Sequence, residues 1–176
     1  ERPVGSSSGT ARMANVPAGD AAVPGRRRPV TFASLQPQFG VSLQVDGMPG
    51  PDPGPGMSFM VDDKAHTLVF TCQDRDGNEL CVPKTVTVAA GEMDQSLDIQ
   101  LAIVPAKLLV EGDPGHSYSI LEVPNITLAA GVLTEIPMLA GRADRTVTVF
   151  DRAEPLKGRQ APLRAGQRHV LSFKNP

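Results

Sequence analysis

Aromatic residues are scarce in this 176-residue chain, which has no tryptophan, one tyrosine and six phenylalanines. A carbohydrate-binding module needs exposed aromatic side chains that stack on sugar rings, so this composition argues against that class of protein. The hydrophobic core must instead be built from Val, Leu, Ile and Met. No apolar run approaches the roughly 18 residues that a membrane-spanning helix needs, so we expect none in this chain.

An excess of charge of one sign is also absent, because the formal net charge is only −2 at pH 7. Without a basic excess, the chain lacks the electrostatic signature of a nucleic-acid-binding protein. The H-E-x-x-H, P-loop and dinucleotide-binding motifs are absent as well. We therefore predict no nucleic acid partner, no catalytic residues, no cofactor and no metal site, and we expect that the protein is not an enzyme.

The three histidines give little reason to expect catalysis. His66 and His169 lie at the start of or within β-type runs, where a strand histidine is the simplest interpretation. His116 lies in the turn-type segment EGDPGHS. Asp113, His116 and Ser117 have the residue types of a catalytic triad, but they are too close in sequence for an acid to orient a general base across a cleft.

There are only two cysteines, and both lie in FTCQDRDGNELCV, residues 70–82. Asp76-Gly77 between apolar runs is typical of a two-residue type I′ hairpin turn. That turn would place Cys72 opposite Cys81 in a non-hydrogen-bonded pair, where the Cα atoms are about 4.5 Å apart. This separation is within disulfide range, so we predict a cross-strand disulfide between Cys72 and Cys81. The alternative is a pair of reduced thiols on a cytosolic hairpin.

Glycine and proline are abundant, with 17 of each, and they separate short β-type runs from residue 30 onward. Apolar and polar residues alternate in residues 85–88, 97–101 and 146–149. Alternation of this kind indicates half-buried strands with one face on a core. No amphipathic stretch of helical length is present, so we predict an all-β chain of ten to twelve strands.

Residues 1–29 are rich in Gly, Ser, Pro and Ala and show no apolar periodicity, which is typical of an extended arm or linker. Near its end lie Arg26, Arg27 and Arg28. A triplet of this kind is most often a solvated charge run, and the alternative is a contact with phosphate or lipid headgroups. We include these three arginines among the candidate partner-binding residues.

The segment MPGPDPGPG, residues 48–56, is a second candidate for partner binding. Because proline has no N–H, we expect this loop to stay out of any strand ladder and to project as a semi-rigid arm. It could simply protect a sheet edge, or it could serve as a docking loop that loses little entropy on binding. The candidate partner-binding residues in it are Met48, Pro49, Pro51, Pro53 and Pro55.

An internal repeat joins the two halves of the chain. In order, GVSLQVDG (40–47) matches PAKLLVEG (105–112), HTLVFTC (66–72) matches RTVTVFD (145–151), and residues 85–101 match residues 161–173. A competing similarity joins residues 82–91 with residues 123–131, and both registers cannot be homologous. We prefer the first register because it aligns three blocks in the same order.

At these residues the chain resembles the PEGA family of small β-domains. Residues 37–47, PQFGVSLQVDG, carry the family's Pro-led pattern with alternating apolar positions and a final Asp-Gly, with one inserted residue. The resemblance covers about residues 30–101 and 105–173. It implies a bacterial, extracytoplasmic setting, often as repeats tethered to a membrane or surface protein, and a mostly non-enzymatic role.

We therefore predict an extended arm (1–29) followed by two tandem small antiparallel β-sandwich domains of Ig-like or PEGA-like type (30–103 and 104–176). The expected function is an extracytoplasmic interaction module, periplasmic or on the cell surface. It would be an accessory or structural subunit that binds other protein subunits of a membrane- or envelope-associated assembly close to the membrane surface. The alternative is the sensor ectodomain of a membrane kinase or surface protein, which would bind a small ligand or a cell-wall polymer.

Overall fold

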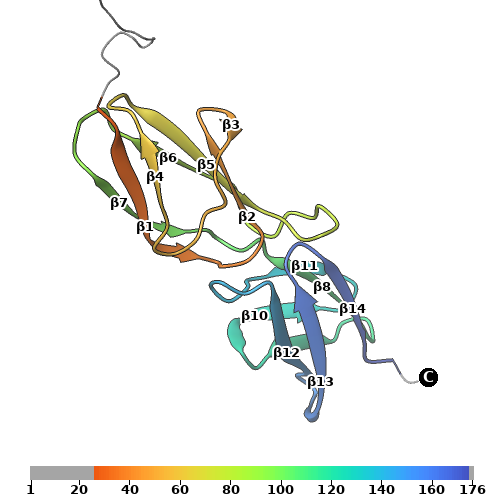
Figure 1. Ribbon diagram of the computed structural model, residues 1–176. Coiled ribbons are helices and arrows are strands. Elements are labelled where there is room, and N and C mark those ends of the chain that lie inside the picture. The colour runs from red at the N-terminus through yellow and green to blue at the C-terminus, as the bar shows by residue number, and fades with distance from the viewer. Residues whose placement is uncertain (1–25, 175–176) are drawn as a thin grey trace, which may run out of the picture.

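Residues 26–174, which the computed structural model describes, contain fourteen β-strands and no helix (Figure 1). The all-β prediction is confirmed. Within this part of the chain, there is no helix with the length and apolar character needed to cross a membrane. The predicted N-terminal arm lies outside the described residues except for its last four, and the first strand already begins at Arg28 rather than after residue 29.

The first seven strands form two sheets, which we call the first sheet pair. The strands are β1 (Arg28–Gln36), β2 (Val41–Val45), β3 (Met48–Pro49), β4 (Ser58–Val61), β5 (His66–Cys72), β6 (Lys84–Val88) and β7 (Gln95–Gln100). One sheet has the order β4-β1-β7 and the other has the order β3-β2-β5-β6.

The last seven strands form the second sheet pair. They are β8 (Ala106–Glu111), β9 (Ser117–Ile120), β10 (Val123–Ala129), β11 (Leu133–Ile136), β12 (Asp144–Asp151), β13 (Glu154–Arg164) and β14 (Arg168–Ser172). The sheet orders are β11-β8-β14 and β10-β9-β12-β13. Each order reproduces that of the first sheet pair, strand for strand, so the chain contains a structural repeat of seven strands (Figure 1).

This repeat corrects one block of the sequence alignment. Residues 66–72 and 145–151 are β5 and β12, which are equivalent strands, and residues 85–101 and 161–173 also fall on equivalent strands. Residues 40–47, however, contain β2, whereas residues 105–112 contain β8, whose equivalent is β1. That block was wrong because alternating apolar residues followed by an acid and a glycine describe many strands.

Pairing between strands is mixed, and this corrects the prediction of antiparallel sheets. Most neighbours are antiparallel, but β1 pairs with β7 in parallel, and β8 pairs with β14 in parallel. In each case the first and last strands of a sheet pair lie side by side. Alternation predicts which face of a strand is buried but carries no information about the direction of its neighbour, so the sequence could not reveal these parallel pairs.

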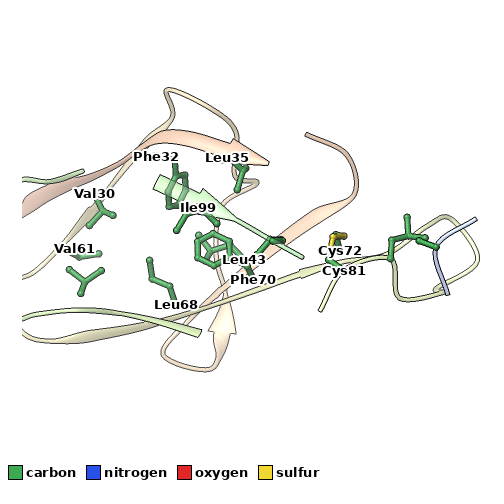
Figure 2. Close-up of a cluster of buried hydrophobic side chains, with 14 residues drawn as sticks. Val30, Phe32, Leu35, Leu43, Val61, Leu68, Phe70, Cys72, Cys81 and Ile99 are labelled. Carbon is green, nitrogen blue, oxygen red and sulfur yellow. A yellow bond between two sulfur atoms is a disulfide. The ribbon is translucent and has the colours of Figure 1, made fainter. Parts of the chain in front are cut away.

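Each sheet pair has its own buried core. In the first, Val30 and Phe32 of β1 pack in one cluster with Leu43, Leu68 and Phe70 of the other sheet (Figure 2). In the second, the core cluster draws on both sheets in the same way; its members include Leu108, Val110, Tyr118, Ile120, Val147, Val149 and Leu171. Most of the few aromatic rings of the chain lie in or against the first core, where Phe32 contacts both Phe59 and Phe70.

Contacts join the two sheet pairs at one end of each. The Val104 N–H donates a hydrogen bond of 2.9 Å to the Leu80 carbonyl. Ala165, which lies between β13 and β14, packs into the core of the first sheet pair. Met138 packs against both cores. The junction is therefore a packed contact in addition to a covalent link.

Candidate functional site

A cleft of about 890 Å³ lies at this junction and is the first candidate site. It is lined by segments from both sheet pairs: the β1–β2 and β5–β6 connections, the β11–β12 connection with the start of β12, and the end of β13 with the connection that follows it. The lining residues are Phe39, Gly40, Gln73, Asp74, Arg75, Asp76, Leu80, Gly141, Arg142, Ala143, Asp144, Arg164 and Gln167. A concave surface with apolar patches and a few convergent polar groups is the usual form of a small-molecule site.

One wall of the cleft is the turn that follows Cys72. Gln73 forms a bridge with Glu79, and the Gly77 N–H donates to the Asp74 carbonyl over 3.1 Å. The loop therefore has three residues, and only Gly77 among its central residues has positive φ. The predicted two-residue type I′ turn was wrong. A type I turn begins at Asp74 and is followed by a bulge at Gly77, so the strand pairing is shifted by one residue from the predicted register.

The Asp74 carboxylate explains this turn. Its Oδ1 accepts hydrogen bonds of 2.9 Å from the backbone N–H groups of both Asp76 and Asn78, and its Oδ2 accepts from the Asn78 side chain. These bonds, with that of the Asn78 amide first, lower the pKa of Asp74 below its usual value. Asp74 therefore stays ionised over the physiological range and provides a fixed negative charge at the cleft.

Arg164 crosses the cleft and links both sheet pairs electrostatically. Its guanidinium lies 3.1 Å from Asp144 of β12 and 3.8 Å from Asp74. Arg75 and Arg142 also line the cleft. Apart from the turn around Asp76, these residues carry no signal in the sequence, because they come from segments far apart in the chain and have no characteristic spacing.

The predicted disulfide is present and lies beside this cleft. Cys72 and Cys81 are bonded, with their Cα atoms 5.2 Å apart, and both are buried at one end of the first core (Figure 2). The Leu80 N–H donates to the Cys72 carbonyl, and Cys81 forms a bridge with Ile103 rather than lying opposite Cys72. The disulfide thus ties the end of β5 to the β5–β6 connection, which pairs at Cys81 with Ile103, just before the second sheet pair.

The Pro/Gly segment 48–56 is exposed, but its start differs from the prediction. Met48 and Pro49 form the edge strand β3, paired with Val45 and Gln44 of β2. Proline is tolerated there because its missing N–H lies on an outer edge. Met48 is 68% exposed, Pro49, Pro51 and Pro55 are exposed, and Pro53 is half-buried. Met48 and Pro49 therefore lie at a sheet edge, and the rest of the segment runs from Gly50, bonded to the Leu43 carbonyl of β2, to Gly56, bonded to the Phe32 carbonyl of β1.

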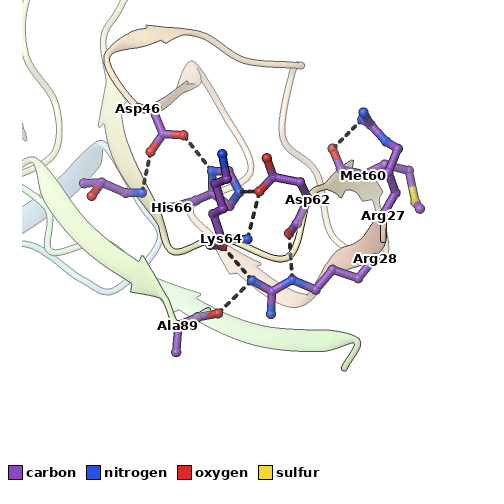
Figure 3. A network of polar contacts seen from close by, with 9 residues as sticks. Arg27, Arg28, Asp46, Met60, Asp62, Lys64, His66 and Ala89 are labelled. Atoms are coloured by element: carbon purple, nitrogen blue, oxygen red, sulfur yellow. Dashed lines mark hydrogen bonds and ion pairs between the residues drawn. The ribbon is translucent and has the colours of Figure 1, made fainter. Parts of the chain in front are cut away.

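The three arginines have separate environments, and Figure 3 shows those of Arg27 and Arg28. Arg26 forms an exposed ion pair of 2.9 Å with Glu92, and Arg27 donates to the Met60 carbonyl over 3.2 Å. Arg28 is only 1% exposed, so its assignment as a partner-binding residue is wrong. It begins β1, and its side chain enters the first sheet pair instead of facing solvent.

Backbone carbonyls surround the Arg28 side chain. Its Nε donates to the Asp62 carbonyl over 3.0 Å, and its Nη2 donates to the carbonyls of Lys64 and Ala89 over 2.9 and 2.7 Å (Figure 3). Nη1 has no hydrogen-bond partner among the residues that the structure describes. Arg28 thus ties the β4–β5 connection to the end of β6, which is a structural role.

His66 lies between two carboxylates near the same connection (Figure 3). Its Nδ1 is 2.6 Å from Asp46 and its Nε2 is 2.7 Å from Asp62. Because a neutral imidazole has only one N–H donor, both contacts are hydrogen bonds only when the ring is protonated. The contact with Asp46, followed by that with Asp62, raises the pKa of His66 despite its partial desolvation.

The second sheet pair has a similar histidine contact, with one carboxylate instead of two. His116 Nδ1 lies 2.7 Å from Asp151, and this contact raises the pKa of His116 and lowers that of Asp151. The Asp151 carboxylate also accepts from the Ala153 N–H. Asp113 and Tyr118 lie nearby, around a cavity of about 110 Å³. Within residues 26–174, no group of three or more His, Cys, Asp and Glu side chains is arranged to hold a metal ion.

Comparison of the chain with known proteins gives no matching protein-family model, no matching curated protein and no matching solved structure.

Proposed function

We propose that the chain is a non-enzymatic, extracytoplasmic protein-interaction module, an accessory or structural subunit of a larger membrane- or envelope-associated assembly. The observation that carries this proposal is the exposed segment 48–56, in which Met48 and three of four prolines face solvent at a sheet edge. A proline-rich segment loses little conformational entropy when a partner binds it. Methionine provides an adaptable apolar contact.

In this proposal, each sheet pair is a small β-sandwich domain of PEGA-like type, with the boundary near residue 104. Separate cores and the repeated strand order support this division. The disulfide supports an oxidising, extracytoplasmic compartment, because disulfides rarely persist in the cytosol. The bacterial setting comes from the resemblance alone.

Site-specific photo-crosslinking in the producing cells tests the interaction surface. We expect a photoreactive residue at Met48 or Pro51 to give an adduct of defined mass, because both positions are exposed at the edge of the sheet. The same residue at Ser96, exposed on β7, is the matched control and should give no such adduct. Adducts that form equally at all three positions, or at none, would contradict the proposal.

A second candidate function is favoured by the cleft at the junction. A sensor ectodomain that binds a small ligand or a cell-wall polymer would use a concave surface between its two units, and the cleft occupies that position. Its exposed Arg75 and Arg142 could contact acidic groups, and Phe39 and Leu80 provide apolar contact.

Titration of the chain with soluble peptidoglycan fragments, followed by amide NMR, tests this second function. Binding should shift the amide signals of Gln73–Asp76 and Gly141–Asp144, and Arg142→Ala should weaken it. Arg152→Ala, an exposed arginine remote from the lining residues, is the control. Shifts that spread over the whole chain, or no shifts at millimolar fragment, would count against the sensor function for this ligand class.

A further inference from the structure

The outer face of the sheet β11-β8-β14 carries an exposed apolar row. Leu109 of β8 is paired with Leu133 of β11 on one side and with Val170 of β14 on the other. Leu133 is 47% exposed, Val170 is 43% exposed, and Leu109 is half-buried. Their neighbours along β8, Leu108 and Val110, point the other way into the core. Three apolar side chains therefore line up across all three strands on the solvent side.

The equivalent row of the first sheet pair is polar. Thr31 of β1 is paired with Ser58, the first residue of β4, and with Ser96 of β7. The Thr31 and Ser58 hydroxyls are 2.6 Å apart and hydrogen-bonded. Because both sheets have the same strand order, apolar residues are not needed at these positions to form the sheet. The apolar row in the second sheet pair is thus a feature of its surface rather than of its topology.

Opposite charges lie on either side of this row along the central strand. Lys107 and Glu111 are exposed on β8, two residues before and two residues after Leu109, and therefore on the same face. A twofold axis that runs across the strands at Leu109 would place Lys107 of one copy opposite Glu111 of the other. The same axis places each residue of the apolar row opposite its own counterpart.

This axis also avoids like-charge contacts at the edges. It brings Arg168 of β14 opposite Ser172, and it brings Glu135 of β11 opposite Gly131, which lies two residues before β11 begins. An axis along the strands would instead place Lys107 against Lys107. The face is thus self-complementary under one twofold operation, as an isologous interface requires.

We propose that a second copy of this chain binds this face, with the two β11-β8-β14 sheets packed face to face about that axis. The face spans about 10 Å across the strands and about 14 Å along them. It is smaller than the roughly 800 Å² per partner of a standard interface, so the self-association is weak and reversible. The proposal does not depend on the proposed function, because the segment 48–56 belongs to the other sheet pair.

Sedimentation velocity of the full chain, from about 10 μM to about 1 mM, tests the proposal. We expect concentration-dependent dimerisation. Leu109→Glu should abolish it by placing two carboxylates against each other at the axis. Thr31→Glu, the matched change on the polar row, should leave it unchanged. Circular dichroism melts of both variants show whether each retains the native fold.

Charge reversal separates this geometry from nonspecific adhesion. Lys107→Glu or Glu111→Lys alone creates two like-charge contacts and should raise the dissociation constant about three- to tenfold at low salt. The double reversal should restore the original affinity. A chain that stays monomeric throughout the concentration range, or a double reversal no better than the single ones, would overturn the proposal and leave this face to a different molecule.

Discussion

The two sheet pairs have the same strand order but stabilise it by different means. In both, the first residue of the first strand is buried and is paired with the last residue of an adjacent strand. Arg28 is paired with Val61 in the first pair, and Ala106 is paired with Ile136 in the second. A long charged side chain and a single methyl group thus occupy equivalent positions. The first pair also has a disulfide, and the two cysteines are the only ones in the chain.

This difference shows that the repeated topology does not depend on any one stabilising contact. Apolar alternation and the turns are common to both pairs, whereas the buried arginine, the disulfide and the histidine contacts are local. In the second pair, Tyr118 and Phe173 pack with ring centroids 4.8 Å apart, while the first pair uses three phenylalanines. Variants that remove each local contact should therefore affect one sheet pair and spare the other.

The largest effect is expected from Arg28→Ala, which gives the first pair the residue found at this position in the second. Three backbone carbonyls would lose their charged donor, and a cavity would form in place of the buried side chain, at a total cost of about 3–5 kcal/mol. Urea unfolding monitored by amide NMR should show the loss in residues 28–100 only. Arg27→Ala, which removes one exposed hydrogen bond, is the control and should have little effect.

Removal of the disulfide should have the next largest effect. The double variant Cys72→Ala/Cys81→Ala opens a loop with a sequence separation of nine residues, which should cost about 2–3 kcal/mol. Chemical denaturation of the variant, and of the wild type with reductant, should give similar losses. Because the bond lies beside the junction, equal destabilisation of both sheet pairs would show that they unfold as one unit.

A smaller effect, in the second pair, is expected from Gly112→Ala. A methyl group at this position would overlap the hydroxyl of the buried Tyr118, and overpacking of this kind costs about 1–3 kcal/mol. Tyr118→Phe in the same chain removes the overlapping oxygen and should recover part of the loss. A thermal-melt double-mutant cycle measures this coupling, and an additive result would contradict the contact.

The smallest expected effect is on the pH dependence of the folding stability. The pKa of His66 is raised in the folded state, so its contribution to stability is fully present below the ordinary histidine pKa and is lost as pH rises through the raised value. The lowered pKa values of Asp46 and Asp62 add stability above the ordinary aspartate pKa, which is lost as pH falls through the lowered values.

His66→Gln should therefore flatten the decline of the first pair's stability as pH rises above about 6.5. His116→Gln should do the same for the second pair only, because its partner is Asp151. Urea midpoints between about pH 5 and pH 9 provide the measurement. If the urea midpoints of both sheet pairs still decline with rising pH in each single variant, these histidines are not the source of the decline.

The fold was predictable to the extent that it depends on alternation. Residues 85–88, 97–101 and 146–149 lie in or across β6, β7 and β12, as their patterns indicate. The described residues form fourteen strands where ten to twelve were predicted, and β3, β4 and β13 lie outside these alternating segments. β3 ends in a proline, and β13 is exposed over most of its length, so neither shows alternation. Their pairing depends on neighbours distant in sequence.

The candidate sites were less predictable than the fold. Cys72 and Cys81 could be paired because a nearby turn brings them together, although Asp74 shifted the register by one residue. Arg28 was misassigned because its three hydrogen-bond acceptors are backbone carbonyls of residues 62, 64 and 89. Every residue has a backbone carbonyl, so a sequence does not show which ones surround a side chain. The cleft could not be predicted, because its lining residues come from both sheet pairs and meet only in the folded chain.

The parallel pairing of first and last strands has a mechanical consequence. Because β1 and β7 run side by side in the same direction, the chain enters this sheet pair at one end and leaves it at the other, and β8 and β14 repeat the arrangement. Tension on the two ends would pull these strands past each other along their length. The load would fall on all hydrogen bonds of the ladder at once, in shear, instead of opening them one at a time.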